Sequence, residues 1–250
     1  MNGLILAAGL GRRLQPLTRT THKALLHVAG KAIVSHLVAG LAAAGVDDII
    51  VVTGHCAREV ESHLRGHHPD THFSFVHNED FERSNNIVSL AAGLGHAIDD
   101  DLLLAECDII LDPALLARLV ASAGDVALVD RYRPGQGGTV ARIDEPSRSV
   151  HELIPAADQT RHMDLTATFK TVNIYRLSRA FVAILRTRLA VEQRARPLAF
   201  YETVFASLLS EGAVTMRALV AAPHYWTEID DAADLARAEA QFPSHTSTPQ

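Results

Sequence analysis

The sequence is poor in the residues that mark several special classes of protein. Its two cysteines, Cys56 and Cys107, stand alone without C-x-x-C spacing, which argues against a disulfide scaffold or a zinc module and is typical of a reducing cytosol. No apolar run approaches the roughly 18 residues of a membrane span. The net charge of −6 also lacks the positive excess that a general nucleic-acid or anionic-membrane binder needs. We therefore expect a cytoplasmic protein that binds neither nucleic acid nor membrane, and the sequence allows a homodimer.

Aromatic residues and lysines are also scarce. Only 5% of the 250 residues are aromatic, and the lysines are Lys23, Lys31 and Lys170. The remaining composition, with 48% hydrophobic and 21% charged residues, is that of a globular protein large enough to bury a sizeable core without disulfides or metal. Two of these three lysines, Lys23 and Lys170, belong to the expected site.

In the first half of the sequence, short apolar runs alternate with segments of helical periodicity. Residues 3–7, 48–53 and 102–105 are continuous apolar runs typical of strands buried on both faces of a parallel sheet. Apolar residues from Ile33 to Ala44 recur at helical spacing and stop at Gly45. Such alternation indicates βαβ units. The other elements expected here are helices at 59–65 and 87–97 and a strand at 73–77.

The second half is less regular, and we expect antiparallel additions to the sheet there. Together the two halves predict an α/β fold: a Rossmann-like three-layer sandwich with a mixed, mostly parallel sheet. Residues 1–242 are expected to form a single domain, and 243–250 a disordered tail. The elements expected in the second half are strands at 125–130, 139–144, 150–154 and 167–175, an edge strand at 215–220, and helices at 178–191 with Ser178 as cap, at 200–210 and at 231–242.

The glycine-rich turn after the first expected strand is the most informative segment. Glycines beyond a buried strand let backbone N–H groups approach phosphate oxygens, and Arg13 and Lys23 can neutralise a polyphosphate. The third glycine of the dinucleotide fingerprint and the GxxxxGK[ST] motif are both absent, which favours a transferase acting on a nucleoside triphosphate. For a lone G-x-G, a tight structural turn is the alternative interpretation. The residues of this turn expected to bind the nucleotide are Leu6, Ala7, Ala8, Gly9, Leu10, Gly11 and Arg12.

This segment resembles the signature of the nucleotidyltransferases that join a nucleoside triphosphate to a phosphorylated small molecule. In that signature GxGxR is followed by PxT and then by a PK pair, and His22 stands where the family usually has proline. The resemblance runs from Gly3 to about Ala240. It implies that Arg13 holds the leaving pyrophosphate, Lys23 stabilises the α-phosphate and Lys170 orients the acceptor. The matching residues are Gly9, Gly11, Arg13, Pro16, Thr18 and Lys23.

A second segment resembles the cytidylyltransferases that act on phosphocholine and on small phosphonates. It comprises residues 78–81 and 84–87, and the strand at 169–175 also resembles that of phosphonate-pathway members. Adjacent amides donate and accept hydrogen bonds, as a pyrimidine edge or a ribose requires. Capping of the following helix by Ser84 or Asn85 is the structural alternative, and it is compatible with binding. The residues of this segment expected to bind the nucleotide are Asn78, Asn85, Asn86 and Ser89.

The expected cofactor is Mg²⁺, which prefers oxygen ligands and is held by one or two carboxylates plus substrate phosphates. Asp108 follows an apolar strand and resembles the family's D-x-D element, with Glu106 in its first position. Asp230 matches the later family aspartate, although Asp230 or Asp231 could instead serve as an N-cap. We expect Asp108 and Asp230 to face the same ion, and Asp108→Ala to abolish turnover with folding nearly unchanged.

The resemblance implies a magnesium-dependent cytidylyltransferase. It would transfer CMP from CTP to a small phosphonate or phosphoalcohol, release pyrophosphate, and serve phosphonate natural-product biosynthesis. Phosphocholine normally requires an aromatic cage, for which Tyr175, Tyr225 and Trp226 are the available residues. A phosphocholine cytidylyltransferase, a sugar- or inositol-phosphate nucleotidyltransferase and, more remotely, a non-catalytic nucleotide sensor remain alternatives.

The acceptor is expected to meet basic residues of the second half. Among them, Arg131, Arg133, His151 and Arg161 could contact an extra carboxylate or hydroxyl group. The residues expected to bind the acceptor are Arg131, Arg133, Asn173 and Tyr175.

Overall fold

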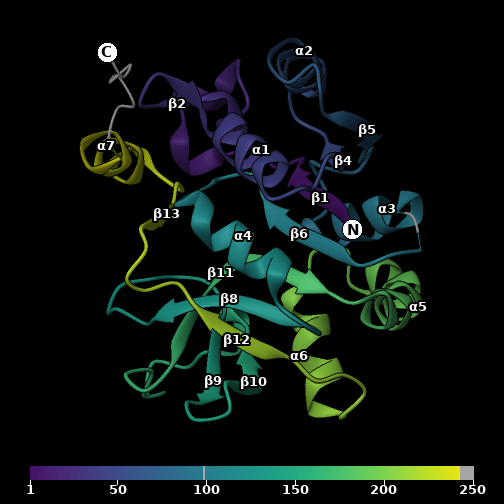
Figure 1. The fold of residues 1–250 in the computed structure, drawn as a ribbon, viewed down its shortest axis with the longest axis vertical. Coiled ribbons are helices and arrows are strands. Elements are labelled where there is room, and N and C mark those ends of the chain that lie inside the picture. Colours follow the sequence, from purple (N-terminus) through teal and green to yellow (C-terminus); the bar gives the residue numbers. More distant parts are fainter. Residues whose placement is uncertain (98, 243–250) are drawn as a thin grey trace.

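The structure is a computed structural model that describes residues 1–97 and 99–242. Within these residues, a sheet of nine strands lies between two layers of helices (Figure 1). The strands of this sheet, in chain order, are β1 (Asn2–Ala7), β4 (Asp48–Thr53), β5 (His72–His77), β6 (Leu102–Glu106), β8 (Val126–Arg131), β9 (Val140–Asp144), β10 (Ser149–Ile154), β11 (Phe169–Leu177) and β12 (Arg217–Val220). The helices are α1 (Ile33–Ala43), α2 (Ala57–His67), α3 (Asn86–His96), α4 (Pro113–Ala121), α5 (Arg179–Ala195), α6 (Glu202–Ser210) and α7 (Ala232–Gln241).

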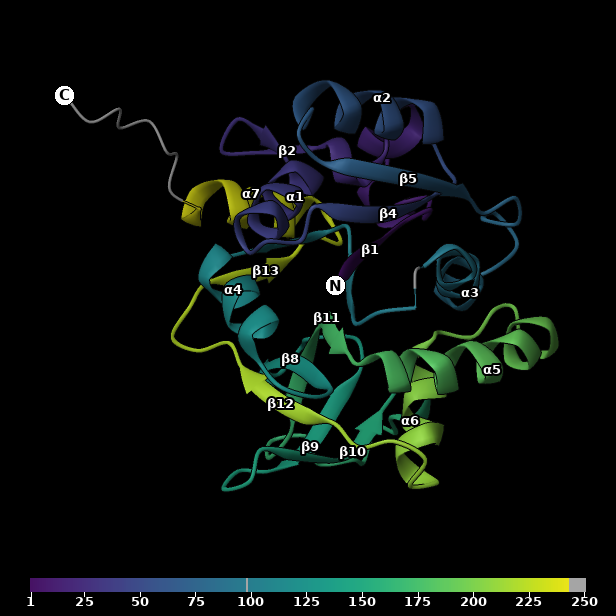
Figure 2. The same ribbon diagram turned by 45° about the vertical axis from the view of Figure 1, so that its right-hand side comes forward.

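Strand β1 shows how the two helical layers are built. All six of its residues are buried, and successive side chains point to opposite faces of the sheet. Leu4 and Leu6 pack in the core beneath α3, α5 and α6, whereas Ile5 and Ala7 pack beneath α1, α2 and α4. Figure 2 shows α1 and α4 on one side of the sheet and α3, α5 and α6 on the other. The three-layer sandwich predicted from the sequence is confirmed.

The strand pairing changes across the sheet, from parallel at one side to mixed at the other. Its order is β5-β4-β1-β6-β11-β8-β12-β10-β9. The first four strands pair in parallel, whereas β11 pairs antiparallel with both β6 and β8, and β10 pairs antiparallel with β9 and β12. The mixed sheet and the antiparallel additions in the second half are therefore confirmed.

One expected strand position is wrong. We predict an edge strand at 215–220, but β12 lies inside the sheet, parallel to β8 and beside β10. Ala218 donates its N–H to the carbonyl of Arg148, and Ala221 donates to that of Val129. These bonds join segments far apart in the sequence, which local periodicity does not reveal.

Four short strands lie outside the main sheet and help to form the site. They form two antiparallel pairs: β2 (His27–Val28) with β3 (Lys31–Ala32), and β7 (Ile109–Leu111) with β13 (Trp226–Glu228). Helix α7 follows β13, and Asp231 caps it by accepting from the N–H groups of Ala233 and Asp234. No helix in the described part of the chain is both long and apolar enough to cross a membrane. The predicted disordered tail, 243–250, lies outside the described residues.

Candidate active site

A cleft of about 1070 Å³ opens at the carboxyl ends of the parallel strands. Strands β1 and β6 are parallel neighbours, so the glycine turn after β1 and the acids after β6 emerge at the same edge of the sheet. The cleft walls include Gly9, Arg13, Lys23, Asp108 and Asp230, which the sequence analysis assigned to one site. The volume is large enough for more than a single small ligand.

Hydrogen bonding and close packing explain the spacing of the glycine motif. Gly11 has φ +58°, in the left-handed region, and a Cβ there would lie 3.1 Å from Cγ2 of Thr18 and 3.3 Å from Cβ of Lys23. The Thr18 hydroxyl donates to the Gly11 carbonyl at 2.7 Å. His22 Nδ1 accepts from the N–H of Ala24 and caps the 3₁₀ turn that carries Lys23. These contacts fold the loop back on itself and direct Lys23 into the cleft.

Pairing between β7 and β13 brings together the acids that are distant in sequence. In this register Glu228 lies opposite Ile109, and the N–H of Ile229 donates to the Asp108 carbonyl at 3.0 Å. Carboxylate oxygens of Glu106, Asp108 and Glu228 lie within 4.8 Å of one another. Asp230 lines the same cleft. Asp108 and Asp230 thus line one cleft, and the expectation that they face the same ion stays a prediction.

Each cation near the acids is paired with one of them. The Lys23 ammonium bonds Asp108, Nη2 of Arg13 lies 2.6 Å from Oδ1 of Asp230, and Nζ of Lys170 lies 3.3 Å from Oε2 of Glu228. Burial works against the charge of Lys23, but Asp108 and, more weakly, Glu106 raise its pKa above the usual value. Lys23 is therefore a permanent cation.

The carboxylates themselves repel one another. Burial, then the charges of Asp108 and Glu202, raise the pKa of Glu106 well above its usual range. Burial also raises the pKa of Glu228 to about 7, with Lys170 opposing the shift and Asp108 adding to it. Burial and Asp108 raise the pKa of Asp230 in the same direction. A cluster with this charge excess is suited to a divalent cation.

The donor set fits such an ion. Asp108 is 1% exposed, and its Oδ1 has no hydrogen-bond partner among the described residues. Glu106 and Glu228 supply further oxygens within reach, and Asp230 stands beside them. Hard oxygen ligands of this kind suit Mg²⁺ or another hard divalent ion.

A β-bulge turns two residues of β11 into the cleft. Lys170 and Asn173 are three positions apart, so in a regular strand they would face opposite sides. The register with β8 shifts between Thr171 and Tyr175, and Asn173 adopts φ +58°, a left-handed conformation that asparagine tolerates. Both Lys170 and Asn173 line the cleft as a result.

The amides expected to bind the nucleotide line the cleft, but their polar groups have protein partners. Asn85 caps α3 by accepting from the N–H of Asn86 at 2.8 Å, as in the structural alternative. Asn86 donates to Glu106 and Glu202 and accepts from the N–H of Tyr201. Asn78 donates to the hydroxyls of Ser84 and Ser89 and accepts from the N–H of Asp80. Each of these amide oxygens accepts one of the bonds described and can accept a second, so base recognition by these side chains stays a prediction.

Two residues expected to bind the acceptor lie elsewhere. Tyr175 is fully buried and packs edge-on against Tyr201 and Phe205, so its side chain belongs to the core. Arg131 lies outside the cleft, where it pairs with Glu145 and covers the ring of Phe169. The alternation of side chains along β8 and β11 determines both positions.

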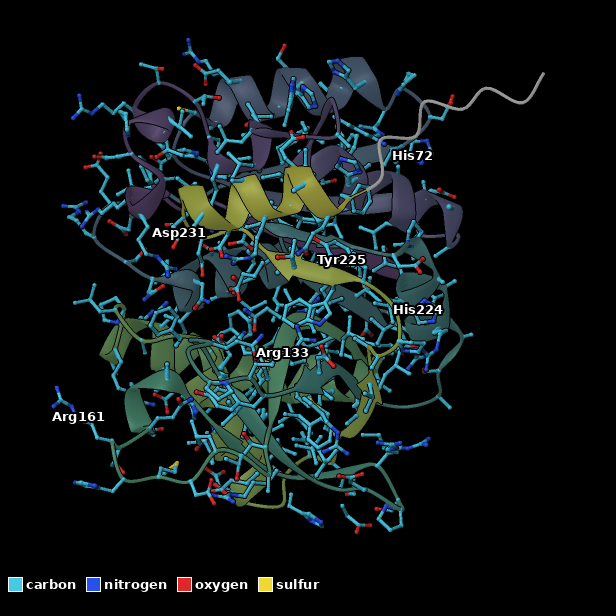
Figure 3. The ribbon with its side chains drawn as sticks, turned by 90° about the vertical axis from the view of Figure 1, so that its left-hand side faces the viewer. His72, Arg133, Arg161, His224, Tyr225 and Asp231 are labelled. Carbon is cyan, nitrogen blue, oxygen red and sulfur yellow. The ribbon has the colours of Figure 1, made fainter. Side chains whose placement is uncertain are left out.

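The other basic residues of the second half also differ in whether they line the cleft. Arg133 lines the cleft and pairs with Asp130 at 3.2 Å. His151 and Arg161 do not line it, and Figure 3 shows Arg161 at the periphery, far from the labelled group of Arg133 and Tyr225. Tyr225 and Trp226 both line the cleft, as expected.

The residues of the glycine turn also differ in whether they line the cleft. Leu6, Ala8 and Gly9 line the cleft, whereas Ala7 points into the core beneath α1. Gly11 and Arg12 line a smaller cavity of about 180 Å³, which shares Arg13, Lys23 and Asp230 with the cleft. Leu10 lines neither cavity.

Glu228, Glu202 and Asp130 are cleft acids that the sequence did not single out as ligands or contacts. Glu228 could have been found, because residues two apart on an extended segment share a face and Asp230 was already assigned. Glu202 and Asp130 carry no such signal. They reach the cleft through the start of α6 and the end of β8, which only the fold brings together.

Comparison with known proteins identifies the family. Residues 3–222 match the family model described as MobA-like NTP transferase domain. A CMP-5'-(3-aminopropyl)phosphonate synthase from Streptomyces rubellomurinus is 31% identical over 249 residues, covering 97% of this chain and 39% of the relative. A choline-phosphate cytidylyltransferase from Haemophilus influenzae is 32% identical over 45% of this chain and 46% of its own. A 2-aminoethylphosphonate cytidylyltransferase from Lancefieldella rimae is 34% identical over 44% of each chain.

Solved structures share the fold across almost the whole chain. The CTP:phosphocholine cytidylyltransferase from Streptococcus pneumoniae superposes with a TM-score of 0.78 at 18% identity, covering 96% of this chain and 97% of its own. The inositol-1-phosphate CTP transferase from T. maritima superposes with a TM-score of 0.78 at 16% identity, covering 99% and 98%. The chain spans less than half the length of each of the three curated relatives named above. The family match covers well over half of this sequence, and the chain belongs to the family of MobA-like NTP transferase domains.

Proposed function

We propose that this chain is a magnesium-dependent cytidylyltransferase that transfers CMP from CTP to a small phosphonate or phosphate acceptor. The observation that carries the proposal is the convergence of Glu106, Asp108 and Glu228 in one cleft with Asp230, Lys23 and the glycine turn. The relatives' names point to the same reaction, since three of them act on phosphonate or choline-phosphate compounds with a cytidine nucleotide.

In the proposed reaction an anionic oxygen of the acceptor attacks the α-phosphorus of CTP. A new P–O bond forms, the bond from the α-phosphorus to the bridging oxygen breaks, and pyrophosphate leaves with that electron pair. The acceptor oxygen is already ionised at neutral pH, so the reaction needs positioning and charge neutralisation more than a general base.

The residues of the cleft can supply this positioning and charge neutralisation. Lys23 is a fixed cation beside the acid cluster and would stabilise charge at the α-phosphate. Arg13 is largely exposed and would turn from Asp230 to the leaving pyrophosphate, and Lys170 would hold the acceptor's anionic group. Asp108, Glu228 and Asp230 would hold Mg²⁺, with Glu106 beside them. When bound, Mg²⁺ supplies positive charge that neutralises phosphate oxygens.

The acceptor is proposed to be a small phosphonate of a natural-product pathway. Support comes from the aminopropylphosphonate relative, which aligns with 97% of this chain. We further propose that residues 1–242 act as one nucleotidyltransferase domain. A cytoplasmic location fits the two free cysteines, Cys56 and Cys107.

Pyrophosphate release, measured with each nucleoside triphosphate in turn, tests the proposal. The acceptors are 2-aminoethylphosphonate, phosphocholine, inositol 1-phosphate and glucose 1-phosphate, each with Mg²⁺. The proposal expects turnover with CTP and a phosphonate or choline phosphate, and loss of turnover in Asp108→Asn. Asp99→Asn, at an acid in an exposed pair with Arg179, is the matched control and should retain turnover. Preference for UTP or dTTP with glucose 1-phosphate would refute the assignment.

A further inference from the structure

His55 contacts both ends of the loop that contains the glycine turn. The parallel pairing of β1 with β4 brings the segments that follow these strands side by side. The N–H of His55 donates to the carbonyl of Ala8 at 3.1 Å, and its imidazole Nε2 lies 3.0 Å from the carbonyl oxygen of Thr18. A Cβ on Gly54 would lie 2.7 Å from the Ala8 carbonyl oxygen, so glycine allows this close approach. One residue after a neighbouring strand therefore bridges the start and the end of the loop of residues 8–18.

The contact at Thr18 continues to the glycine that shapes the turn. Thr18 is 1% exposed, and its hydroxyl donates to the carbonyl of Gly11, the residue with φ +58°. A fixed Gly11 carbonyl also fixes the N–H of Arg12, because both groups belong to one planar peptide unit. Backbone N–H groups of such a turn bind phosphate oxygens. The path from His55 through Thr18 therefore ends at the groups expected to hold the triphosphate.

The neighbours of the imidazole determine where its proton lies. A carbonyl oxygen only accepts, so Nε2 of His55 carries the proton and donates to Thr18. Sγ of Cys56 lies 3.3 Å from the same nitrogen, and a thiol is the weaker partner of the two. The centroid of the Phe81 ring lies 6.5 Å from that of the imidazole. A hydrogen-bond donor at the position of Nε2 is therefore what the loop requires of this side chain.

Resting on the proposed function, we propose that His55 is a positioning residue of the transfer reaction, which holds the loop of residues 8–18 in the shape that binds the triphosphate. Its side chain lines neither the cleft nor the smaller cavity beside it, so it acts through the backbone and not by touching a substrate. Loss of its imidazole donor should therefore weaken binding of the nucleotide and leave the acceptor side of the cleft unchanged.

Two substitutions separate the hydrogen bond of His55 from its bulk. His55→Gln keeps an amide donor that can reach the Thr18 carbonyl, whereas His55→Leu fills similar space without a donor. With CTP and Mg²⁺, calorimetry should give a Kd about threefold to tenfold higher for His55→Leu, the worth of one hydrogen bond. The Kd of His55→Gln should stay near that of the wild type. His77→Leu is the matched control and should also keep the wild-type Kd, because His77 ends the neighbouring strand β5 and faces the exposed Glu79.

A second variant interrupts the same path one step further along. Thr18→Val keeps the shape of the side chain but removes the hydroxyl that donates to Gly11, so it should raise the Kd for CTP as His55→Leu does. The double variant should bind CTP little more weakly than either single variant, because both changes release the same part of the loop. Thr18→Val also tests the proposal if His55→Leu does not fold. Deuterium exchange without nucleotide should be faster for peptides of residues 8–18 in both single variants than in the wild type.

The outcomes separate this proposal from the proposed function. An unchanged Kd in His55→Leu, or an equal rise in His55→Leu and His55→Gln, overturns the positioning role while leaving the cytidylyltransferase proposal intact. A lower melting temperature of His55→Leu with an unchanged Kd is what a purely structural residue would give. If the wild type binds another nucleoside triphosphate but not CTP, the cytidylyltransferase proposal fails, and the same variants test His55 with that nucleotide. Binding of no nucleoside triphosphate overturns both proposals.

Discussion

Removing the charge of Lys23 should destabilise the protein more than removing that of its partner Asp108. The two side chains are 18% and 2% exposed and form an ion pair, and breaking such a buried pair from one side costs about 3–5 kcal/mol. Lys23→Met leaves Asp108 without its own cation beside Glu106, Glu228 and Asp230, so that Lys170 and Arg13, paired with Glu228 and Asp230, offset only part of the repulsion. We expect a loss of about 3–5 kcal/mol for this variant.

Asp108→Asn should cost less, because it also removes repulsion from the neighbouring acids. A loss of about 1–3 kcal/mol corresponds to leaving the Lys23 ammonium partly unsatisfied. This revises the expectation from the sequence that a substitution of Asp108 leaves folding nearly unchanged. In the double variant the two costs should overlap, so that its loss of stability is clearly smaller than their sum.

Urea denaturation at pH 7, without metal or nucleotide, measures all three variants. Arg142→Met is the control, because it breaks an exposed pair with Glu152 and should cost less than about 1 kcal/mol. Added Mg²⁺ should restore part of the stability of Lys23→Met, since the ion binds only the folded acid cluster. The account would be contradicted if the losses of unfolding free energy in the two single variants added up in the double variant. It would also be contradicted if Lys23→Met lost no more unfolding free energy than Arg142→Met, because the acids would then not repel one another as described.

Three further predictions follow from particular side chains. Burial and Lys23 lower the pKa of His22 from 6.5 to about 3, so below pH 6.5 only the unfolded chain takes up this proton. Unfolding free energy should then fall by about 1.4 kcal/mol per pH unit between pH 6.5 and 4.5, relative to His22→Asn, and parallel pH curves for the two proteins would contradict this. Gly138 has φ +93°, and a Cβ there would lie 2.8 Å from Nζ of Lys170, so Gly138→Ala should lose about 1–3 kcal/mol of stability. It should raise the KM of the acceptor more than that of CTP, and equal changes in both would count against Lys170 as an acceptor residue. Tyr175→Phe removes a buried hydroxyl without a partner in the described chain and should leave the KM of the acceptor unchanged, so a large rise would return Tyr175 to the site.

The sequence predicts the parts of this fold that depend on local pattern. Continuous apolar runs such as 3–7 and 48–53 form strands because both faces of the sheet are covered there. The glycine motif can be recognised in the sequence because Gly11, Thr18 and Lys23 contact one another within a short loop. Ser178 and Asp231 are caps in the structure as their residue types suggest.

Long-range pairing accounts for what the sequence did not reveal. The position of β12 inside the sheet depends on β8 and β10, and the arrival of Glu228 at the acid cluster depends on the register of β13 with β7. Whether Tyr175 faces the core or the cleft depends on the bulge in β11, which shifts the alternation between Thr171 and Tyr175.

The central claim is that a triphosphate and one divalent ion share the site formed by the glycine turn and the acids after β6 and β13. Crystals grown with CTP and Mn²⁺ test it directly, because the anomalous signal of manganese locates the ion independently of the phasing model. The account predicts one strong peak bound by Asp108 with Glu228 or Asp230, and a triphosphate lying along residues 8–13. A manganese peak away from Asp108, or a triphosphate bound outside the glycine turn, would contradict it.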